Sequence, residues 1–283
     1  MPETDGMAES KRKRNKMFKT RLISGIVLVI LAILLITTGG SILWCALIGI
    51  SWIGMHELYR IFNIEKSAIG VVGYLSALIY YLFLQFFALP DMMLFVLGTL
   101  VVMMFVYVFT YPRYRTEQIL ASFFGVFYVA VMLSYIYQTR MLTNGEYIVW
   151  LIFLCSWGSD TCAYCVGMLI GKHKMSPKLS PKKSVEGAVG GVVGSMLLTL
   201  LYTGVFREAM QISIEQMLLL AVISGVGAFI SMIGDLTASA IKRNYDVKDY
   251  GNLIPGHGGI LDRFDSVIFT APIVYYLATI LIG

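Results

Sequence analysis

The feature that most constrains this chain is a series of long apolar segments separated by short polar ones. Most segments run for roughly 17 to 25 residues, the length of helix that crosses the hydrocarbon core of a bilayer. Hydrophobic residues make up 58% of the 283 residues and charged residues only 14%, whereas soluble domains contain about 25% charged residues. The segments are continuously apolar rather than alternating, which argues against a transmembrane β-barrel. We therefore expect an all-α polytopic membrane protein.

The apolar segments predict about nine transmembrane helices. Their ranges are 22–39, 41–54, 67–89, 91–111, 119–137, 147–170, 187–206, 216–238 and 264–282. The second segment is short for a full crossing, and we expect it to bend around Gly49 and Gly54.

The composition changes along the chain and suggests three parts. Residues 1–21 form a basic N-terminal segment, and residues 22–145 are almost purely apolar, as expected for scaffold helices. Residues 146–283 carry polar side chains within the spans and two polar loops, 171–186 and 239–263. We expect the chemistry to lie in this last part.

Basic residues predict the orientation in the membrane. With the N-terminus in the cytoplasm, 20 of the 22 Lys and Arg residues fall in segments assigned to the inside, and only Arg140 and Arg207 fall outside. This distribution follows the positive-inside rule. We predict a multi-pass protein of the cell (inner) membrane with both polar loops on the cytoplasmic side. The basic run 11–14 fits a topology signal beside anionic lipid headgroups, so no nucleic-acid partner is expected.

Two aspartates fall inside predicted spans, where an ionised carboxylate is costly unless it faces a polar cavity or a partner. Asp235, Ser239 and Lys242 are spaced i, i+4 and i+7, so they share one helix face. Asp160 and Tyr164 share a face of another helix in the same way. The alternative interpretation is a protonated carboxyl that hydrogen-bonds between packed helices.

The loop at 171–187 contains five lysines, one histidine and three serines around two prolines. Ammonium and hydroxyl groups bind phosphate oxygens, although basic charge on an inside loop can also serve topology alone. The candidate ligands of a phosphate group here are Lys172, His173, Ser180, Lys183 and Ser184. We also expect Ser184 to cap the helix that follows.

The stretch 239–265 combines glycines, carboxylates and basic residues. Gly256, Gly258 and Gly259 allow tight turns that present backbone N–H groups to phosphate. Asp262 lies at the start of the last span, and Asp235 lies on the other side of the loop. One or two carboxylates plus substrate phosphates are the usual ligands of Mg²⁺. The alternative is a solvated loop with surface ion pairs.

These residues resemble the signature of the phosphatidate cytidylyltransferases (CDP-diacylglycerol synthases). The matching positions downstream are Ser239, Lys242, Arg243, Lys248, Asp249, Gly251, Pro255, His257, Gly258, Gly259, Asp262, Arg263, Phe264 and Asp265. Those upstream are Asp160, Tyr164, Gly171, Lys172, His173, Ser180, Lys183, Ser184, Glu186 and Gly187. Ser184 stands where the family usually has threonine, and Val185 replaces a common aromatic residue. The resemblance is specific over residues 160–265.

The resemblance implies transfer of the cytidylyl group of CTP to phosphatidate, in a multi-span membrane protein that forms homodimers. It implies Mg²⁺ held by Asp235 and Asp262, with a second, monovalent cation such as K⁺. Asp249 and Asp265 match other signature acids of the family.

A mechanism without a covalent enzyme intermediate is consistent with these residues, because the phosphate of phosphatidate is itself the nucleophile. We expect Lys242, Arg243 and Arg263 to balance the charge of the leaving pyrophosphate, and Asp265 to pair with Lys242. His257 either donates to phosphate or stabilises the turn.

Two other functions fit parts of the pattern. An ion-coupled transporter also carries intramembrane aspartates, although no inverted repeat is evident. Another CTP-dependent lipid transferase or kinase would share the nucleotide chemistry and take a lipid alcohol instead.

Overall fold

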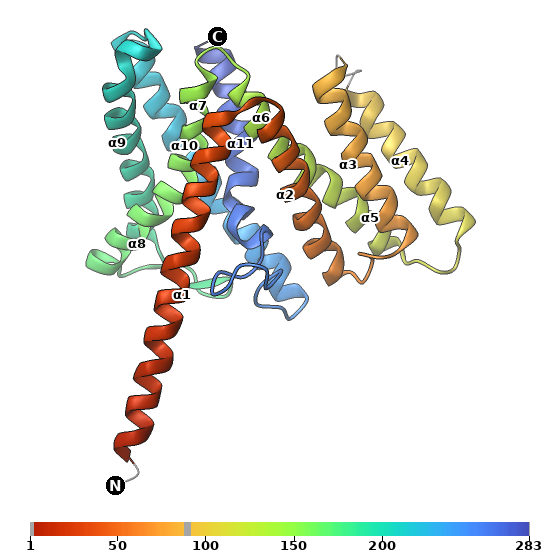
Figure 1. The fold of residues 1–283 in the computed structure, drawn as a ribbon, viewed down its shortest axis with the longest axis horizontal. Coiled ribbons are helices and arrows are strands. Elements are labelled where there is room, and N and C mark those ends of the chain that lie inside the picture. The colour runs from red at the N-terminus through yellow and green to blue at the C-terminus, as the bar shows by residue number, and fades with distance from the viewer. Residues whose placement is uncertain (1–2, 88–91, 283) are drawn as a thin grey trace.

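The chain folds into a bundle of long helices with one small β-hairpin at the end where its polar loops gather (Figure 1). The computed structural model describes residues 3–87 and 92–282, with side chains described from Lys19 onward apart from Arg21. The helices are α1 (Glu3–Thr38), α2 (Gly40–Ile61), α3 (Ala68–Phe86), α4 (Met92–Phe109), α5 (Thr116–Gly125), α6 (Met132–Arg140), α7 (Gly145–Phe153), α8 (Ser159–Ile170), α9 (Val185–Met210), α10 (Ile214–Asn244) and α11 (Leu261–Leu281). The basic run 11–14 falls on side chains outside the described part.

Eight stretches of helix in the described part are long and apolar enough to cross a membrane, and the apolar half of α1, Leu22–Thr38, is a ninth, slightly shorter one. The π-helical segments η1 (Val126–Val131) and η2 (Leu154–Gly158) join α5 to α6 and α7 to α8, so each pair forms one span. A polytopic all-α membrane fold is thereby confirmed. The predicted boundary between the third and fourth spans includes residues 88–91, which lie outside the described residues.

Two predicted boundaries are wrong. The second span does not stop at residue 54, because α2 continues to Ile61. No proline or glycine interrupts residues 55–61, so nothing in that stretch ends a helix. The helix α10 likewise continues past residue 238 to Asn244. Lys242 is therefore helical, as its predicted face with Asp235 and Ser239 requires, and the loop that follows is shorter than the predicted 239–263.

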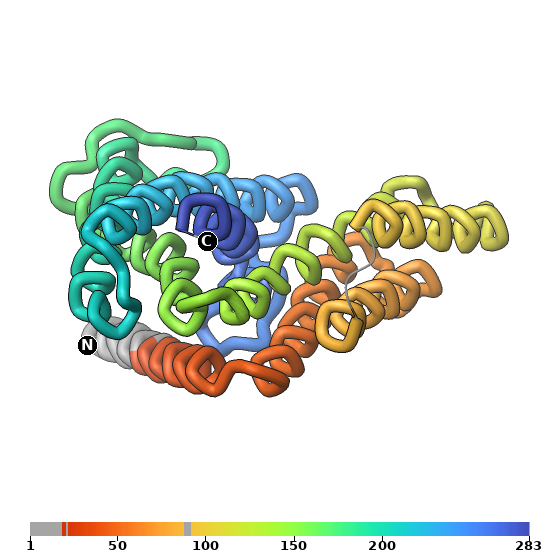
Figure 2. The backbone as a smooth tube through the Cα atoms, turned by 90° about the horizontal axis from the view of Figure 1, so that it is seen from above, coloured from red at the N-terminus to blue at the C-terminus, as the bar shows by residue number. Residues whose placement is uncertain are grey.

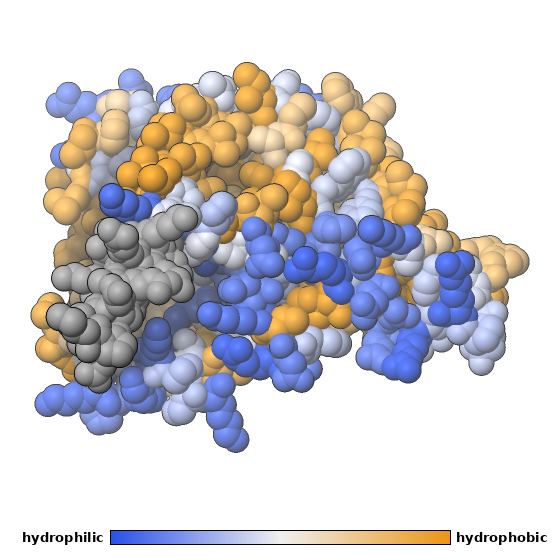
Figure 3. Space-filling view, turned by 60° about the horizontal axis from the view of Figure 1, so that its bottom comes forward, coloured by the Kyte–Doolittle hydropathy of each residue, from blue (hydrophilic) through white to orange (hydrophobic). Residues whose placement is uncertain are grey.

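The elements are arranged along one elongated molecule (Figures 1 and 2). Helices α3, α4 and α5 form one end, α8, α9 and α10 form the other, and α1, α2, α6, α7 and α11 lie between them. The β-hairpin, β1 (Lys174–Ser176) with β2 (Ser180–Ser184), and the loop 245–260 both lie toward the end of the bundle that α1 extends from. Hydrophilic side chains gather on this end, flanked by apolar ones (Figure 3).

Small residues allow α8 and α9 to pack closely. A Cβ atom on Gly187 would lie 2.8 Å from the Ala163 carbonyl oxygen, and one on Gly191 would lie 2.9 Å from the Ser159 hydroxyl. Substitutions at these glycines would force the two helices apart. This contact holds the helix that bears Asp160 against the helix that begins at the β-hairpin.

Candidate active site

A cavity of about 530 Å³ lies among α8, α9, α10, α11 and the β-hairpin. This volume is typical of a small-molecule site. Five aspartates and four basic residues from well-separated parts of the chain line it, which are Asp160, Asp235, Asp249, Asp262, Asp265, Lys182, Lys183, Lys242 and Arg263. Tyr164 and Ser184 also lie in its wall. The structure therefore brings together many of the residues that the sequence analysis selected.

Three of the aspartates come from three different helices. Asp160 lies in the first turn of α8, Asp235 near the end of α10, and Asp265 in the second turn of α11. The carboxylate of Asp235 is close enough to repel those of Asp160 and Asp265 electrostatically. Like charges gathered in a poorly solvated site favour a bound cation or a shared proton.

The β-hairpin contributes a cation to this cluster. Lys183 Nζ forms an ion pair with Asp235 Oδ2, and about a quarter of each side chain remains exposed. Ser184 is the N-cap of α9 and accepts a hydrogen bond from Gly187 N at 3.1 Å, which confirms the expected cap. A short antiparallel hairpin, which the sequence analysis did not predict, thus positions Lys183 over α10.

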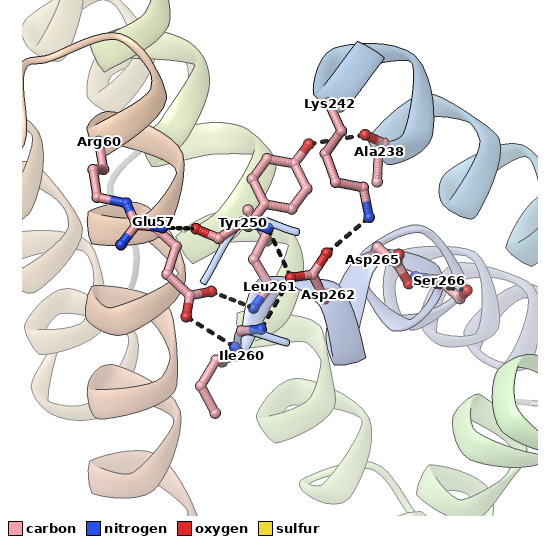
Figure 4. A network of polar contacts seen from close by, with 11 residues as sticks. Glu57, Arg60, Ala238, Lys242, Tyr250, Ile260, Leu261, Asp262, Asp265 and Ser266 are labelled. Carbon is pink, nitrogen blue, oxygen red and sulfur yellow. Dashed lines mark hydrogen bonds and ion pairs between the residues drawn. The ribbon is translucent and has the colours of Figure 1, made fainter. Parts of the chain in front are cut away.

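Asp262 organises the loop that precedes α11 (Figure 4). Its Oδ2 atom accepts hydrogen bonds from Tyr250 N at 2.8 Å and Gly259 N at 3.0 Å, and its Oδ1 atom lies 2.7 Å from Lys242 Nζ. The residue is only 5% exposed. Asp262 therefore joins α10, α11 and the loop into one unit, with its second oxygen toward the lysine.

The expected pairing of Asp265 with Lys242 is wrong. Among the described residues, Lys242 forms its ion pair with Asp262, whereas Asp265 Oδ1 accepts from Ser266 N at 2.7 Å and from the Ser266 hydroxyl at 3.3 Å. The reason is their position along α11. Asp262 lies next to the loop that Lys242 faces, whereas Asp265 lies almost one helical turn further into the bundle. Asp265 thus lines the cavity, and no described lysine lies within ion-pair distance of it.

The loop 245–260 turns back on itself through left-handed glycines. Gly256 has φ 78° and Gly258 has φ 83°, values that residues with a Cβ rarely adopt. Ile254 N donates to Gly258 O at 2.9 Å, which closes the turn. Tyr250 is buried beneath it and donates to the Ala238 carbonyl at 3.2 Å. Burial raises the pKa of the Tyr250 hydroxyl, so this group stays protonated and the bond persists.

His257 lies on the side of the loop that faces α1. Its Nδ1 atom is 2.7 Å from the Ser24 hydroxyl, so the membrane part of α1 holds the turn. A second cavity of about 380 Å³ opens here and is mostly apolar, lined by Leu28, Val29, Leu31, Ala32, Leu35, Trp157, Phe264 and others. Asp160 and Arg263 line both cavities, so an apolar groove adjoins the polar site.

Several predicted ligands do not line the polar cavity. They are Lys172, His173, Ser180, Ser239, Arg243, Lys248, His257, Gly258 and Gly259. Glu186 holds the start of the hairpin, since it accepts hydrogen bonds from the N–H groups of Lys172 and His173 and lies 2.6 Å from His173 Nδ1. Gly259 N is directed to Asp262, so this amide serves the loop itself. That the nine residues outside the cavity bind a substrate stays a prediction.

The donor set of the cavity fits a hard divalent cation. Within the part of the chain that the structure describes, His, Cys, Asp and Glu form no cluster of three or more with metal-ligand geometry. Mg²⁺ needs only one or two protein carboxylates when substrate phosphates complete its octahedral shell. Asp235 and Asp262 both line the cavity, and the repulsion around Asp235 favours a cation at this position.

Sequence reasoning missed two charged residues of α2 that contact the loop. Glu57 accepts hydrogen bonds from Ile260 N at 3.0 Å and Leu261 N at 2.8 Å, and Arg60 Nη2 donates to Tyr250 O at 2.6 Å. Residues 55–66 were expected to form a connecting loop, where charge is ordinary. Had the helix been predicted to continue to Ile61, Glu57 would have stood out as an acid near the end of an apolar helix.

Comparisons with known proteins identify the family of this chain. The sequence model of the Cytidylyltransferase family matches residues 19–281. Phosphatidate cytidylyltransferase of Staphylococcus saprophyticus is 33% identical over 268 residues, covering 92% of this chain and 98% of the relative. The proteins of the same name from Bacillus subtilis and Staphylococcus aureus are 29% and 31% identical over 267 residues, each covering 92% of this chain.

Proposed function

This chain belongs to the cytidylyltransferase family and is an enzyme, and we propose that it converts CTP and phosphatidate into CDP-diacylglycerol and pyrophosphate. An oxygen of the phosphatidate phosphate attacks the α-phosphorus of CTP. The bond from that phosphorus to the oxygen bridging the α- and β-phosphates breaks, and pyrophosphate leaves. No proton has to be removed from an ionised phosphate, so the protein contributes positioning and charge stabilisation.

The observation that carries the proposal is the mixture of charges in the 530 Å³ cavity. Carboxylates alone would suit a cation, and basic residues alone would suit an anion. A cavity lined by both is suited to a nucleoside triphosphate bound together with a divalent ion. Membership of the cytidylyltransferase family supports transfer of a cytidylyl group. It therefore argues against the alternative of an ion-coupled transporter.

We infer that Asp235 and Asp262 hold Mg²⁺, with Asp160 and Asp265 contributing negative charge from the same wall. A bound divalent ion would neutralise charge on the phosphates and orient them for in-line displacement. A monovalent cation beside it, as the resemblance implies, would suit the remaining carboxylates.

The basic residues of the cavity are the candidates for binding phosphate. Arg263 Nε is buried and has no hydrogen-bond partner among the described residues, so an anion in the cavity would satisfy it. Lys183 and Lys242 are each paired with an aspartate. If a metal ion bound these carboxylates, both ammonium groups would be able to move toward a triphosphate and bind its oxygens.

The apolar groove supports a binding site for the acyl chains of the lipid substrate. Phosphatidate has to bring a phosphate to the polar cavity while its acyl chains stay in an apolar environment. The groove lined by α1 meets the polar cavity at Asp160 and Arg263. We propose that an acyl chain occupies the groove and that Arg263 lies beside the lipid phosphate.

Orientation, membrane and assembly follow as further parts of the proposal. The distribution of basic residues supports a cytoplasmic position for the hairpin and the loop 245–260, where CTP is available, in a protein of the inner membrane of the cell. Residues 146–283 would carry most of the chemistry and residues 22–145 the scaffold. The family resemblance also favours a homodimer.

The direct test is an assay of the purified protein in lipid nanodiscs with labelled CTP, Mg²⁺ and phosphatidate. Formation of labelled CDP-diacylglycerol with stoichiometric pyrophosphate supports the proposal. Replacing phosphatidate with diacylglycerol or dolichol tests the other CTP-dependent lipid enzymes. Absence of product with phosphatidate, or a faster reaction with a lipid alcohol, would overturn the assignment.

A further inference from the structure

Glu57 is a buried acid in an otherwise apolar helix. It is 5% exposed, and Arg60 is the only other Asp, Glu, Lys or Arg of α2. A carboxylate in such a place is retained only where hydrogen-bond donors or charges compensate its burial. The donors are two backbone N–H groups, Ile260 N at 3.0 Å and Leu261 N at 2.8 Å.

These donors are the N–H groups of the N-cap residue and of the first residue of α11. The opening N–H groups of a helix have no partner within the helix, and side chains, water or ligands accept from them instead. The N-cap of α11 is Ile260, which has no side chain that can accept a bond. Glu57 caps this end from a different helix by accepting from the N–H groups of the N-cap residue and of the first helical residue, and its negative charge also complements the positive end of the helix dipole.

The surrounding loop is shaped to admit this carboxylate. A Cβ atom on Gly251 or on Gly259 would collide with the Glu57 carboxyl group. One helical turn along α2, Arg60 donates to the Tyr250 carbonyl at 2.6 Å. Tyr250 N and Gly259 N in turn donate to Asp262. The loop 250–261 is thus held from two sides, by α2 and by Asp262 (Figure 4).

We propose that Glu57 is a positioning residue for the transfer reaction: by capping α11 from α2, it fixes the turn that carries Asp262, Arg263 and Asp265. This inference rests on the function proposed above. It gives the N-terminal half of the chain a part in catalysis, because the direction of the first turn of α11 depends on a side chain from α2. Glu57 itself does not line the polar cavity.

The substitution Glu57→Gln tests this role with little change in volume. The amide keeps one acceptor oxygen and turns an NH₂ group toward the backbone donors, so the cap is half lost. We expect kcat for CDP-diacylglycerol formation to fall about 10- to 100-fold, as displacement of catalytic groups by about 1 Å does. Amide hydrogen exchange over residues 258–262 should become at least tenfold faster. Glu57→Asp keeps the charge on a shorter side chain, so it should retain part of the wild-type kcat and part of the slow exchange over residues 258–262.

Tyr59→Phe is the matched control. Tyr59 is also buried in α2, and its hydroxyl donates to the Ser122 carbonyl at 2.7 Å, away from the loop. It should lower the melting temperature as Glu57→Gln does while leaving kcat within twofold of wild type. If both variants lose activity in proportion to their loss in melting temperature, the proposal would be overturned.

The exchange measurement separates this proposal from the reaction itself. Wild-type protein that makes no CDP-diacylglycerol would overturn the proposed function, and with it the catalytic part of this inference. Unchanged exchange over residues 258–262 in Glu57→Gln would overturn the cap alone, whatever the activity. Faster exchange with unchanged kcat would show a structural cap without a role in the reaction and would equally refute the proposal.

Discussion

Lys242 at the end of α10 and Asp262 at the start of α11 form a buried ion pair, with 2.7 Å between Nζ and Oδ1. The Asp262 side chain is 2% exposed and that of Lys242 is 12% exposed. The pair closes the base of the loop 245–260, since the two residues flank it. It therefore couples the shape of the loop to the charges of the cavity.

Removal of one partner should destabilise the protein strongly. Lys242→Met leaves the Asp262 carboxylate buried without its counter-charge, which typically costs about 3 to 5 kcal/mol. The double variant with Asp262→Asn should regain part of this loss, because neither charge then remains unpaired. Thermal unfolding in detergent measures both effects. Equal melting temperatures for the single variant and wild type would show that the pair contributes nothing to stability.

Asp235→Asn should abolish transfer while the fold persists. Its partner Lys183 keeps the nearby Asp160 carboxylate as a counter-charge, so loss of the pair should cost on the order of 1 to 2 kcal/mol and leave the protein folded. Loss of a metal-binding carboxylate should lower kcat by about 100-fold or more. Titration with Mg²⁺ in the labelled-CTP assay should show a higher half-saturating concentration. The control is Asp246→Asn, which changes an exposed acid just after α10 and outside the cavity, and full activity of Asp235→Asn would refute the metal assignment.

Much of the fold could be predicted from the sequence because a bilayer restricts the choice of structure. Runs of apolar residues had to be helices, since no other open structure satisfies backbone hydrogen bonds in lipid. The Asp235, Ser239 and Lys242 stripe followed from helix periodicity alone. The proximity of residues 160, 235 and 265 could be predicted only in part. Periodicity shows which residues share one face of a helix, but it does not show which helices pack beside one another.

Pairings between elements could not be predicted in this way. Lys242 lies 20 positions from Asp262 and 23 from Asp265, and only the path of the loop decides which carboxylate it meets. Glu57 bonds to backbone atoms more than 200 residues away. Backbone N–H groups are present at every position except proline, so no side-chain motif marks them as the partners of an acid.

Two of the lysines in the hairpin region, Lys172 and Lys183, should differ in their kinetic effects. Lys172 is exposed and lies outside the cavity, whereas Lys183 lines it. Lys172→Ala should raise the apparent KM for CTP or phosphatidate up to about fivefold with little change in kcat, as expected for an exposed charge. Lys183→Ala should lower kcat/KM by about 10- to 100-fold, since it removes a charge-assisted contact in the site. Steady-state kinetics with each substrate varied separately gives both values, and an effect of Lys172→Ala on kcat alone would move that residue into the catalytic group.

The apolar groove predicts a preference that depends on acyl-chain length. Ala32 lines the groove on α1, so Ala32→Trp should fill it and lower kcat/KM for long-chain phosphatidate on the order of tenfold. A phosphatidate with very short acyl chains does not need the groove and should react at the wild-type rate. Ile30→Trp adds a bulky residue to the same helix at an exposed position outside the groove and should change neither rate. Comparison of the three proteins with both lipids in nanodiscs measures the effect. Equal losses with long-chain and short-chain lipid in Ala32→Trp would assign the groove to helix packing and leave the acyl chain to another path into the site.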